Sequence, residues 1–273
     1  MPTFTTMQDL EDKLPEVDDL DVLEKTKSDP LLKTALQLSR PVNWWGSGLG
    51  PQQILPIAEQ GIPVSWIPDQ EILVVLAAAR PKDRPAILLS YEDAIVSQCR
   101  ACLEEVKNTD FADTKQLISR SIDTLDAGFH EAAIALAVAV AEGLALWASR
   151  LRAGVIESLK GGDMMEISKR VNRRLASLGE SYRLAREELA SGTLVQGFDV
   201  PRRALIAPIP TFFEPFYPGK GDPVPVYLSR HAVAHQPTVE HFNRANAITA
   251  VMLASSLLRA RDEHLDYVYI EDE

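Results

Sequence analysis

The stretch FHEAAIALAVAVAEGLALWASRL, residues 129–151, decides the fold class of this chain. Ala, Leu and Val make up most of it, and this composition favours one long helix that neighbouring helices can approach closely. Within it, the apolar run from Ala132 to Trp147 is short for a membrane span of about 20 residues and Glu142 interrupts it, so we expect the centre of an all-α helical bundle and no membrane contact. A buried carboxylate needs a partner, and the arginine of residues 227–235 is the candidate for Glu142.

Helical spacing of apolar residues continues on both sides of this stretch. It predicts helices over residues 31–40, 70–79, 84–106, 110–125 and 164–189, and a last helix that Thr238 caps and that ends near His264. Residues 42–68 are rich in Gly and Pro and cannot form one long helix. Their tryptophans are expected to anchor an irregular segment on the core rather than to form a ligand cage. Strand signals are limited to residues 64–67 and 267–270.

Residues 191–226 contain seven prolines together with Phe212, Phe213, Phe216 and Tyr217. We expect an ordered loop here, because the aromatic side chains need burial. The expected organisation is an acidic lead-in (residues 1–30), an N-terminal helical accessory region (31–108) and a helical domain (109–270) that holds this long proline- and aromatic-rich loop.

The net charge of −11 argues against a protein that coats nucleic acid through bulk charge. The charge is uneven, because residues 1–30 hold nine acidic residues against three lysines, whereas residues 150–186 hold nine basic residues against four acidic ones. The acidic lead-in is expected to be a solubilising tail, or else a shield over the basic face that RNA or a partner displaces.

Cys99 and Cys102 are the two cysteines of the chain. They provide no disulfide framework and the chain opens without a basic and apolar leader, so we expect a reducing, cytoplasmic setting. Since no second ligand pair accompanies the C-x-x-C spacing, two incidental thiols are expected rather than a redox or zinc site.

The segment Tyr227-Leu-Ser-Arg-His-Ala-Val-Ala-His235 carries the candidate chemistry. The guanidinium of Arg230 can hold an anionic phosphate, and the imidazole of His235 titrates near neutral pH and can move protons. RNA can be cut by its own 2′-hydroxyl if His235 removes that proton and Arg230 stabilises the crowded phosphorane, with His231 in support. Neither step requires a metal or a cofactor. His231 and His235 have a spacing that can hold zinc, but no glutamate follows His231 as in H-E-x-x-H.

Arg230 and His235 lie about 140° apart on an ideal helix. One copy of the segment is therefore expected to converge poorly. Two copies that face each other across a symmetric interface would assemble the site, so we expect a homodimer.

These features resemble the HEPN superfamily (higher eukaryotes and prokaryotes nucleotide-binding domains). The resemblance rests on residues 128–137, on the arginine, polar residue and later histidine at Arg230, His231 and His235, and on the Asn243-Arg-Ala-Asn246-Ala-Ile block with Leu257-Leu258 after it. It implies an all-α bundle that works as a homodimer with facing motifs and cuts RNA without metal, as a toxin or antiviral defence effector. Two alternatives stay open: a non-catalytic relative that binds a nucleotide or a protein partner, and a capped helix whose histidine is a core residue.

The helix expected over residues 164–189 carries most of the basic residues. They could guide RNA toward the site, or they could form a solvated helix face: Lys169, Arg170, Arg173, Arg174, Arg183 and Arg186. The expected partners are RNA, a second copy of the chain and a regulatory protein.

Overall fold

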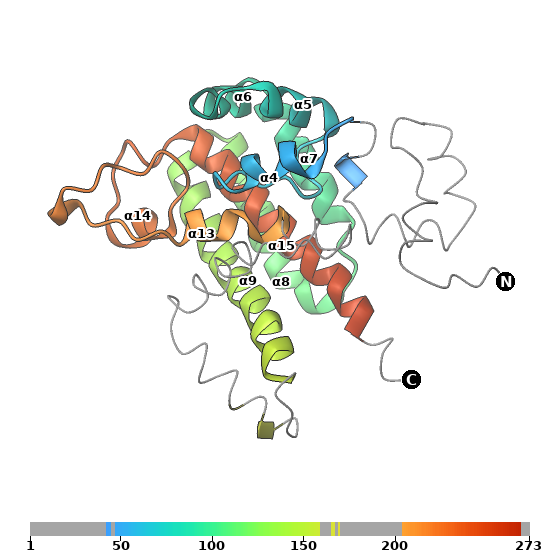
Figure 1. Cartoon of the computed structure of the whole chain (residues 1–273). Helices are drawn as coiled ribbons and strands as arrows, with labels where there is room; N and C mark the ends of the chain where they lie inside the picture. Colours follow the sequence, from blue (N-terminus) through green and yellow to red (C-terminus); the bar gives the residue numbers. More distant parts are fainter. Residues whose placement is uncertain (1–41, 45–46, 159–164, 167–168, 170–203, 269–273) are drawn as a thin grey trace.

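Helices and connecting loops make up the computed structural model, which describes residues 42–44, 47–158, 165–166, 169 and 204–268. Its elements, with η for a 3₁₀ turn, are η1 (Val42–Trp44), α4 (Pro51–Ala58), α5 (Gln70–Ala78), η2 (Pro81–Asp83), α6 (Arg84–Ser90), α7 (Glu92–Glu104), η3 (Thr109–Phe111), α8 (Ala112–Asp126), α9 (His130–Ser158), α13 (Pro208–Phe212), η4 (Pro218–Lys220), α14 (Arg230–His235) and α15 (Arg244–Val268) (Figure 1). The described residues include no strand, which confirms the all-α class. The helix expected over residues 31–40 lies outside the described residues.

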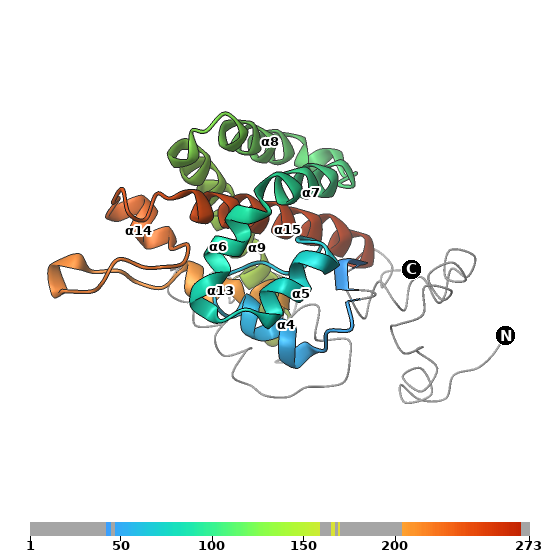
Figure 2. The same cartoon turned by 90° about the horizontal axis from the view of Figure 1, so that it is seen from above.

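Helix α9 packs on both α15 and α8 (Figures 1 and 2). Ala133, Ala137, Ala141 and Ala145 recur at every fourth position, and each is at most 1% exposed. Residues four apart share one helix face, so these small side chains form a continuous buried stripe. The expected central, alanine-rich helix is confirmed.

Local signals set some of the helix ends. Asp69 caps α5, because its carboxylate accepts a hydrogen bond from the Ile72 N–H at 3.1 Å. Gly128, with φ of +85°, lets the chain turn between α8 and α9.

The expectation of a single helix over residues 84–106 is wrong. Tyr91 leaves helical geometry at φ −112° and ψ 17°, and the Ser90 hydroxyl donates to the Ile87 carbonyl at 2.8 Å. The chain therefore forms two helices, α6 and α7. Helical spacing of apolar residues persists across the break, so it does not reveal a change of axis.

The start expected for the last helix is also wrong. The Thr238 hydroxyl accepts from the His241 N–H at 3.2 Å and so closes a separate turn. Helix α15 begins six residues later at Arg244, where the Asn243 side-chain oxygen accepts from the Asn246 N–H at 2.9 Å. It runs to Val268 and therefore includes residues 267 and 268, the first two of the strand expected over residues 267–270. The other expected strand, residues 64–67, is irregular.

The two helical regions expected on either side of residue 108 share one hydrophobic core. Helices α6 and α7 pack on α15, and α7 also packs on α8. The carboxylate of Asp262 on α15 accepts hydrogen bonds from the backbone N–H groups of Lys107 and Asn108 at 3.0 and 2.9 Å. This buried cap joins the end of the α7 segment to the last helix.

Two expectations about aromatic residues can be followed in the structure. Trp44 is buried and its indole N–H donates to the Val64 carbonyl at 2.7 Å, so it anchors the irregular segment as expected. In the proline-rich loop, Phe212, Phe213 and Phe216 are buried, whereas Tyr217 is 45% exposed. The part of the loop that follows α13 projects, with α14, from one side of the helical body (Figure 1).

Candidate active site

The segment expected to carry the chemistry forms the short helix α14. Ser229 caps it, since the Ser229 hydroxyl accepts from the Ala232 N–H and donates to the Glu214 carbonyl, both at 3.3 Å. A helix of six residues is too short to be stable alone, so tertiary contacts must hold it. The fully buried Ala232 and the packing of α14 on α9 provide these contacts.

Arg230 lies between a carboxylate and an imidazole. Its Nη2 is 3.0 Å from Oε1 of Glu142 on α9, which confirms the partner expected for that carboxylate. Its Nη1 is 3.1 Å from Nε2 of His235. Both members of the ion pair are largely buried, with 16% of the Arg230 side chain and 24% of the Glu142 side chain exposed.

The expectation that Arg230 and His235 converge poorly in one copy is therefore wrong. The angle of 140° separates the directions of the Cα–Cβ bonds, whereas the arginine side chain is long enough to reach along the helix surface to the next turn. A single copy of the chain therefore brings the Arg230 guanidinium and the His235 imidazole into contact.

The contact also favours one tautomer of His235. Arginine can only donate, so Nε2 of His235 is the acceptor in this hydrogen bond, and a ring that accepts there carries its N–H at Nδ1. His235 is exposed to solvent, which contradicts the alternative of a core histidine. Its unprotonated nitrogen can accept a proton from a substrate once the arginine turns to another acceptor.

His231 lies between His235 and the proline-rich loop. Its ring centre is 4.9 Å from that of His235 and 5.3 Å from that of Tyr217, both edge to face. Burial, the neighbouring His235 and the charge of Arg230 lower the pKa of His231 below its ordinary value of 6.5. His231 is therefore neutral at pH 7.

The turn from Tyr217 to Asp222 presents two further side chains beside His231. Backbone bonds from the Lys220 and Gly221 N–H groups close the turn, and the Asp222 carboxylate accepts from the Tyr217 N–H at 2.8 Å. The ammonium of Lys220 lies 4.5 Å from the centre of the Tyr217 ring. The sequence predicts burial for Tyr217, whereas the structure places an exposed aromatic ring and a cation next to the motif that Arg230, His231 and His235 form.

A buried histidine that has no recognisable sequence signal, His241, holds the beginning of α14. His241 is fully buried; its Nδ1 lies 3.1 Å from the Pro225 carbonyl oxygen and its Nε2 lies 3.3 Å from the Ser229 nitrogen. A lone histidine without a repeated spacing has no sequence signal, because its role depends on two backbone groups that only the fold brings together.

The remaining predicted residues are less informative. Of the six predicted basic residues between positions 169 and 186, only Lys169 lies within the described residues, and it is exposed on a helical stretch; the other five lie outside them.

Cys99 and Cys102 are buried, and burial raises the pKa of Cys102 to about 12 and that of Cys99 further, as expected of inert thiols. Among the described residues, no group of three or more His, Cys, Asp or Glu side chains could hold a metal ion.

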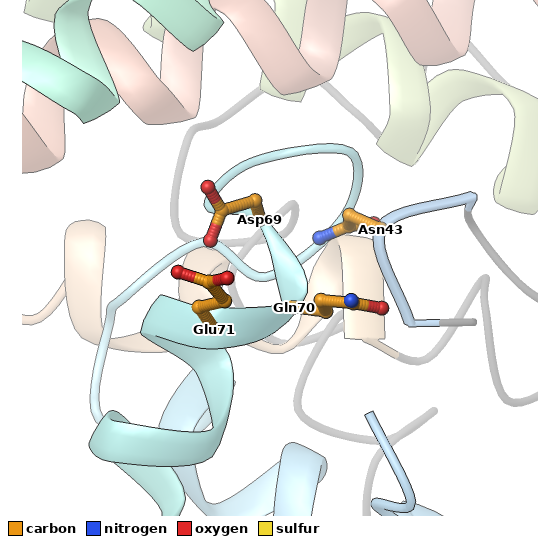
Figure 3. A pocket seen from close by; sticks show the side chains of 4 residues that line it. All are labelled: Asn43, Asp69, Gln70 and Glu71. Atoms are coloured by element: carbon orange, nitrogen blue, oxygen red, sulfur yellow. The ribbon is translucent and has the colours of Figure 1, made fainter. Parts of the chain in front are cut away.

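A surface pocket of about 340 Å³ lies away from the motif, lined by Asn43, Asp69, Gln70 and Glu71 (Figure 3). The Asn43 amide is used by the Val64 and Pro68 carbonyls and the Trp66 N–H. The Asp69 carboxylate caps α5 and accepts from the Gln98 side chain. Two of the four lining side chains therefore already hold the fold together.

No family model, curated protein or solved structure matches the chain. Within the described residues, no helix is long and apolar enough to cross a membrane. What the chain does is therefore inferred from the chemistry and geometry of its own residues.

Proposed function

We propose that the chain is a metal-independent endoribonuclease, similar to the HEPN type, that cleaves RNA by transesterification. The single observation that carries this proposal is the 3.1 Å contact between the Arg230 guanidinium and Nε2 of the exposed His235 ring. Glu142 supports the arrangement, because it engages Nη2 and leaves Nη1 directed at His235.

Cleavage then follows from an exchange of hydrogen-bond partners. A phosphate oxygen of RNA replaces His235 as the acceptor of the Arg230 Nη1–H, and the freed Nε2 takes the proton of the adjacent 2′-hydroxyl. The 2′-oxygen attacks phosphorus, the bond to the 5′-oxygen breaks, and a cyclic phosphate and a 5′-hydroxyl result. The leaving 5′-oxygen needs a proton from the opposite side of the phosphorus.

A second copy of the chain would supply that proton from its own His235, in the imidazolium form that this ring takes once its Nε2 has released Arg230 and has bound a proton from water. Arg230 and His235 meet within one copy, so a homodimer is proposed for this second proton transfer and not to assemble the pair. Val226 and Val239 on the connections that flank α14 are 67% and 91% exposed, and they provide apolar surface for such an interface. Light scattering at micromolar concentration tests the homodimer, and a species of 30.2 kDa alone would contradict it.

The decisive experiment is incubation of the purified chain with end-labelled RNA in EDTA. We expect cleavage that leaves a cyclic phosphate and a 5′-hydroxyl, and no cleavage by the His235→Ala variant. Activity that returns only with added Mg²⁺ or Mn²⁺ would move the mechanism to another class. Expression of the wild-type chain in a host cell should slow growth as a toxin or defence effector does, and His235→Ala should relieve the effect.

The Arg230–Glu142 ion pair favours one alternative. A carboxylate that offsets the charge of the arginine weakens its attraction for phosphate. The alternative is a non-catalytic HEPN-like module that binds a nucleotide or a protein partner on the same surface. RNA that is bound but left intact in EDTA and in Mg²⁺ would support this alternative.

A further inference from the structure

His241 is fully buried and both of its ring nitrogens face backbone groups with fixed roles. The Pro225 carbonyl can only accept, so Nδ1 must carry a proton. The Ser229 N–H can only donate, so Nε2 must be unprotonated. The fold therefore selects the neutral Nδ1–H tautomer of this imidazole.

These two bonds hold the beginning of α14. Ser229 is the cap of α14, and Pro225 lies four residues before it on the incoming loop. On the other side, the Asn246 side chain donates to the His241 carbonyl at 2.9 Å, which ties His241 to the first turn of α15. His241 thus links the start of the motif helix to the start of the last core helix, and α14 lies at that end of α15 in Figure 2.

We propose that His241 is a positioning residue that holds α14, and with it Arg230 and His235, in place only while its imidazole is neutral. A proton on Nε2 would point an N–H at the Ser229 N–H and break the bond that anchors the cap. Its role in RNA cleavage rests on the proposed function, whereas its role in holding α14 does not.

The surroundings of His241 favour the neutral form. Burial lowers the pKa of His241 below 6.5, against a smaller opposing effect of the hydrogen bond to Pro225. The charged side chains on the adjoining segments point elsewhere: Glu214 and Glu240 are exposed, Arg230 pairs with Glu142, and Arg244 pairs with Glu92. Acidification below the lowered pKa is what would release the anchor.

Matched substitutions separate positioning from simple space filling. His241→Gln can present an amide oxygen near the place of Nε2, keeps the acceptor for Ser229 and does not titrate. His241→Asn can present its amide N–H near the place of Nδ1 and keeps only the bond to Pro225. His241→Phe fills the cavity without either bond. Glu240→Gln, at the exposed neighbouring position, is the control.

The first readout needs no RNA. Nitrogen chemical shifts of the ring should identify Nδ1 as protonated and Nε2 as free. Amide exchange of Ser229, Ala232 and Val233, corrected for intrinsic rates, should accelerate about 5- to 150-fold in His241→Phe and His241→Asn, the cost of leaving a buried donor unpaired. In the wild type it should accelerate only as the pH falls through the titration of His241, and in His241→Gln it should be independent of pH.

The second readout is cleavage. We expect kcat to fall in His241→Asn and His241→Phe while KM for RNA changes little, and the acid limb of kcat to shift in His241→Gln. Wild-type amide exchange in His241→Asn, or the same pH dependence in His241→Gln as in the wild type, would overturn the proposal even if His241→Phe failed to fold. Absence of cleavage by the wild type, with the exchange results as expected, would refute the ribonuclease alone.

Discussion

The Arg230 guanidinium on α14 pairs with the Glu142 carboxylate on α9 at 3.0 Å, and this ion pair joins a surface motif to the central helix of the bundle. Because both side chains are largely buried, removal of either partner leaves the other without compensation. The pair therefore links the stability of the fold to the orientation of the candidate phosphate-binding group.

We expect Glu142→Ala and Arg230→Ala each to lower the free energy of unfolding by about 1–3 kcal/mol. The double variant should lose less than the sum of the two, with a coupling energy of about 0.5–3 kcal/mol in a double-mutant cycle by urea denaturation. Glu131→Gln changes an exposed carboxylate on the same helix and is the control. Additive losses would mean that the ion pair contributes nothing.

His235→Ala should reduce RNA cleavage at least about 100-fold, the usual contribution of a general base, and should leave the unfolding transition nearly unchanged because His235 is exposed. Gln236→Ala, at the next exposed position, should cleave at the wild-type rate. Arg230→Ala should lose at least as much activity as His235→Ala. If both site variants cut RNA as fast as the wild type, the assignment of the catalytic pair is wrong.

The exposed ring of Tyr217, 5.3 Å from His231, is placed to stack on a base next to the scissile phosphate. Tyr217→Ala should raise KM about 5- to 150-fold, the cost of one lost stacking contact, while Tyr217→Phe should stay close to the wild type. Lys220→Met should reduce the slope of log affinity against log salt by about 0.7, as for one lost phosphate contact on a single strand. An equal effect of Ala and Phe at position 217 would point to the hydroxyl instead of the ring.

Stability should depend on acidity through His231 and His241. Both have a folded-state pKa below 6.5, so the unfolded chain binds protons first as the pH falls. The histidine contribution to the free energy of unfolding is complete above pH 6.5, declines as the pH drops below it, and levels off once the folded-state pKa values are passed. Urea denaturation of wild type and His241→Gln across this range should show a weaker dependence in the variant.

Substitution of Arg170, Arg173 and Arg174 together by Gln tests the basic face predicted from the sequence. Affinity for RNA should fall regardless of sequence, the salt slope should flatten by about 0.7 for each lost phosphate contact, and kcat at saturating RNA should hardly change. An unchanged salt slope would make these residues a solvated face without a role in RNA binding.

Much of the fold could be predicted because its helices have local signals. The alanine-rich composition of α9, the cap at Asp69 and the glycine at position 128 are properties of short windows. The break at Tyr91 and the late start of α15 depend on what each turn packs against, and apolar spacing alone does not report this. A threonine such as Thr238 caps a single turn as readily as a long helix.

The motif residues were visible in sequence, but their geometry was not. An ideal helix gives the direction of each Cα–Cβ bond, and this made Arg230 and His235 look too far apart; the length of the arginine side chain and its ion pair with Glu142 decide where the guanidinium lies. His241 has no sequence signal and Tyr217 is exposed where burial was expected, since their partners come from segments that meet only in the folded chain.

The alanine stripe of α9 has a genetic consequence. Ala141 is fully buried, so a larger side chain at this position would have to push helix α9 away from its neighbours. Glu142 directly follows Ala141, and its carboxylate would move with the helix. Loss-of-function alleles should therefore arise in the bundle interior without touching any motif residue. Second-site suppressors of such alleles should map to the small residues of the facing helices, α15 and α8, and not to α14.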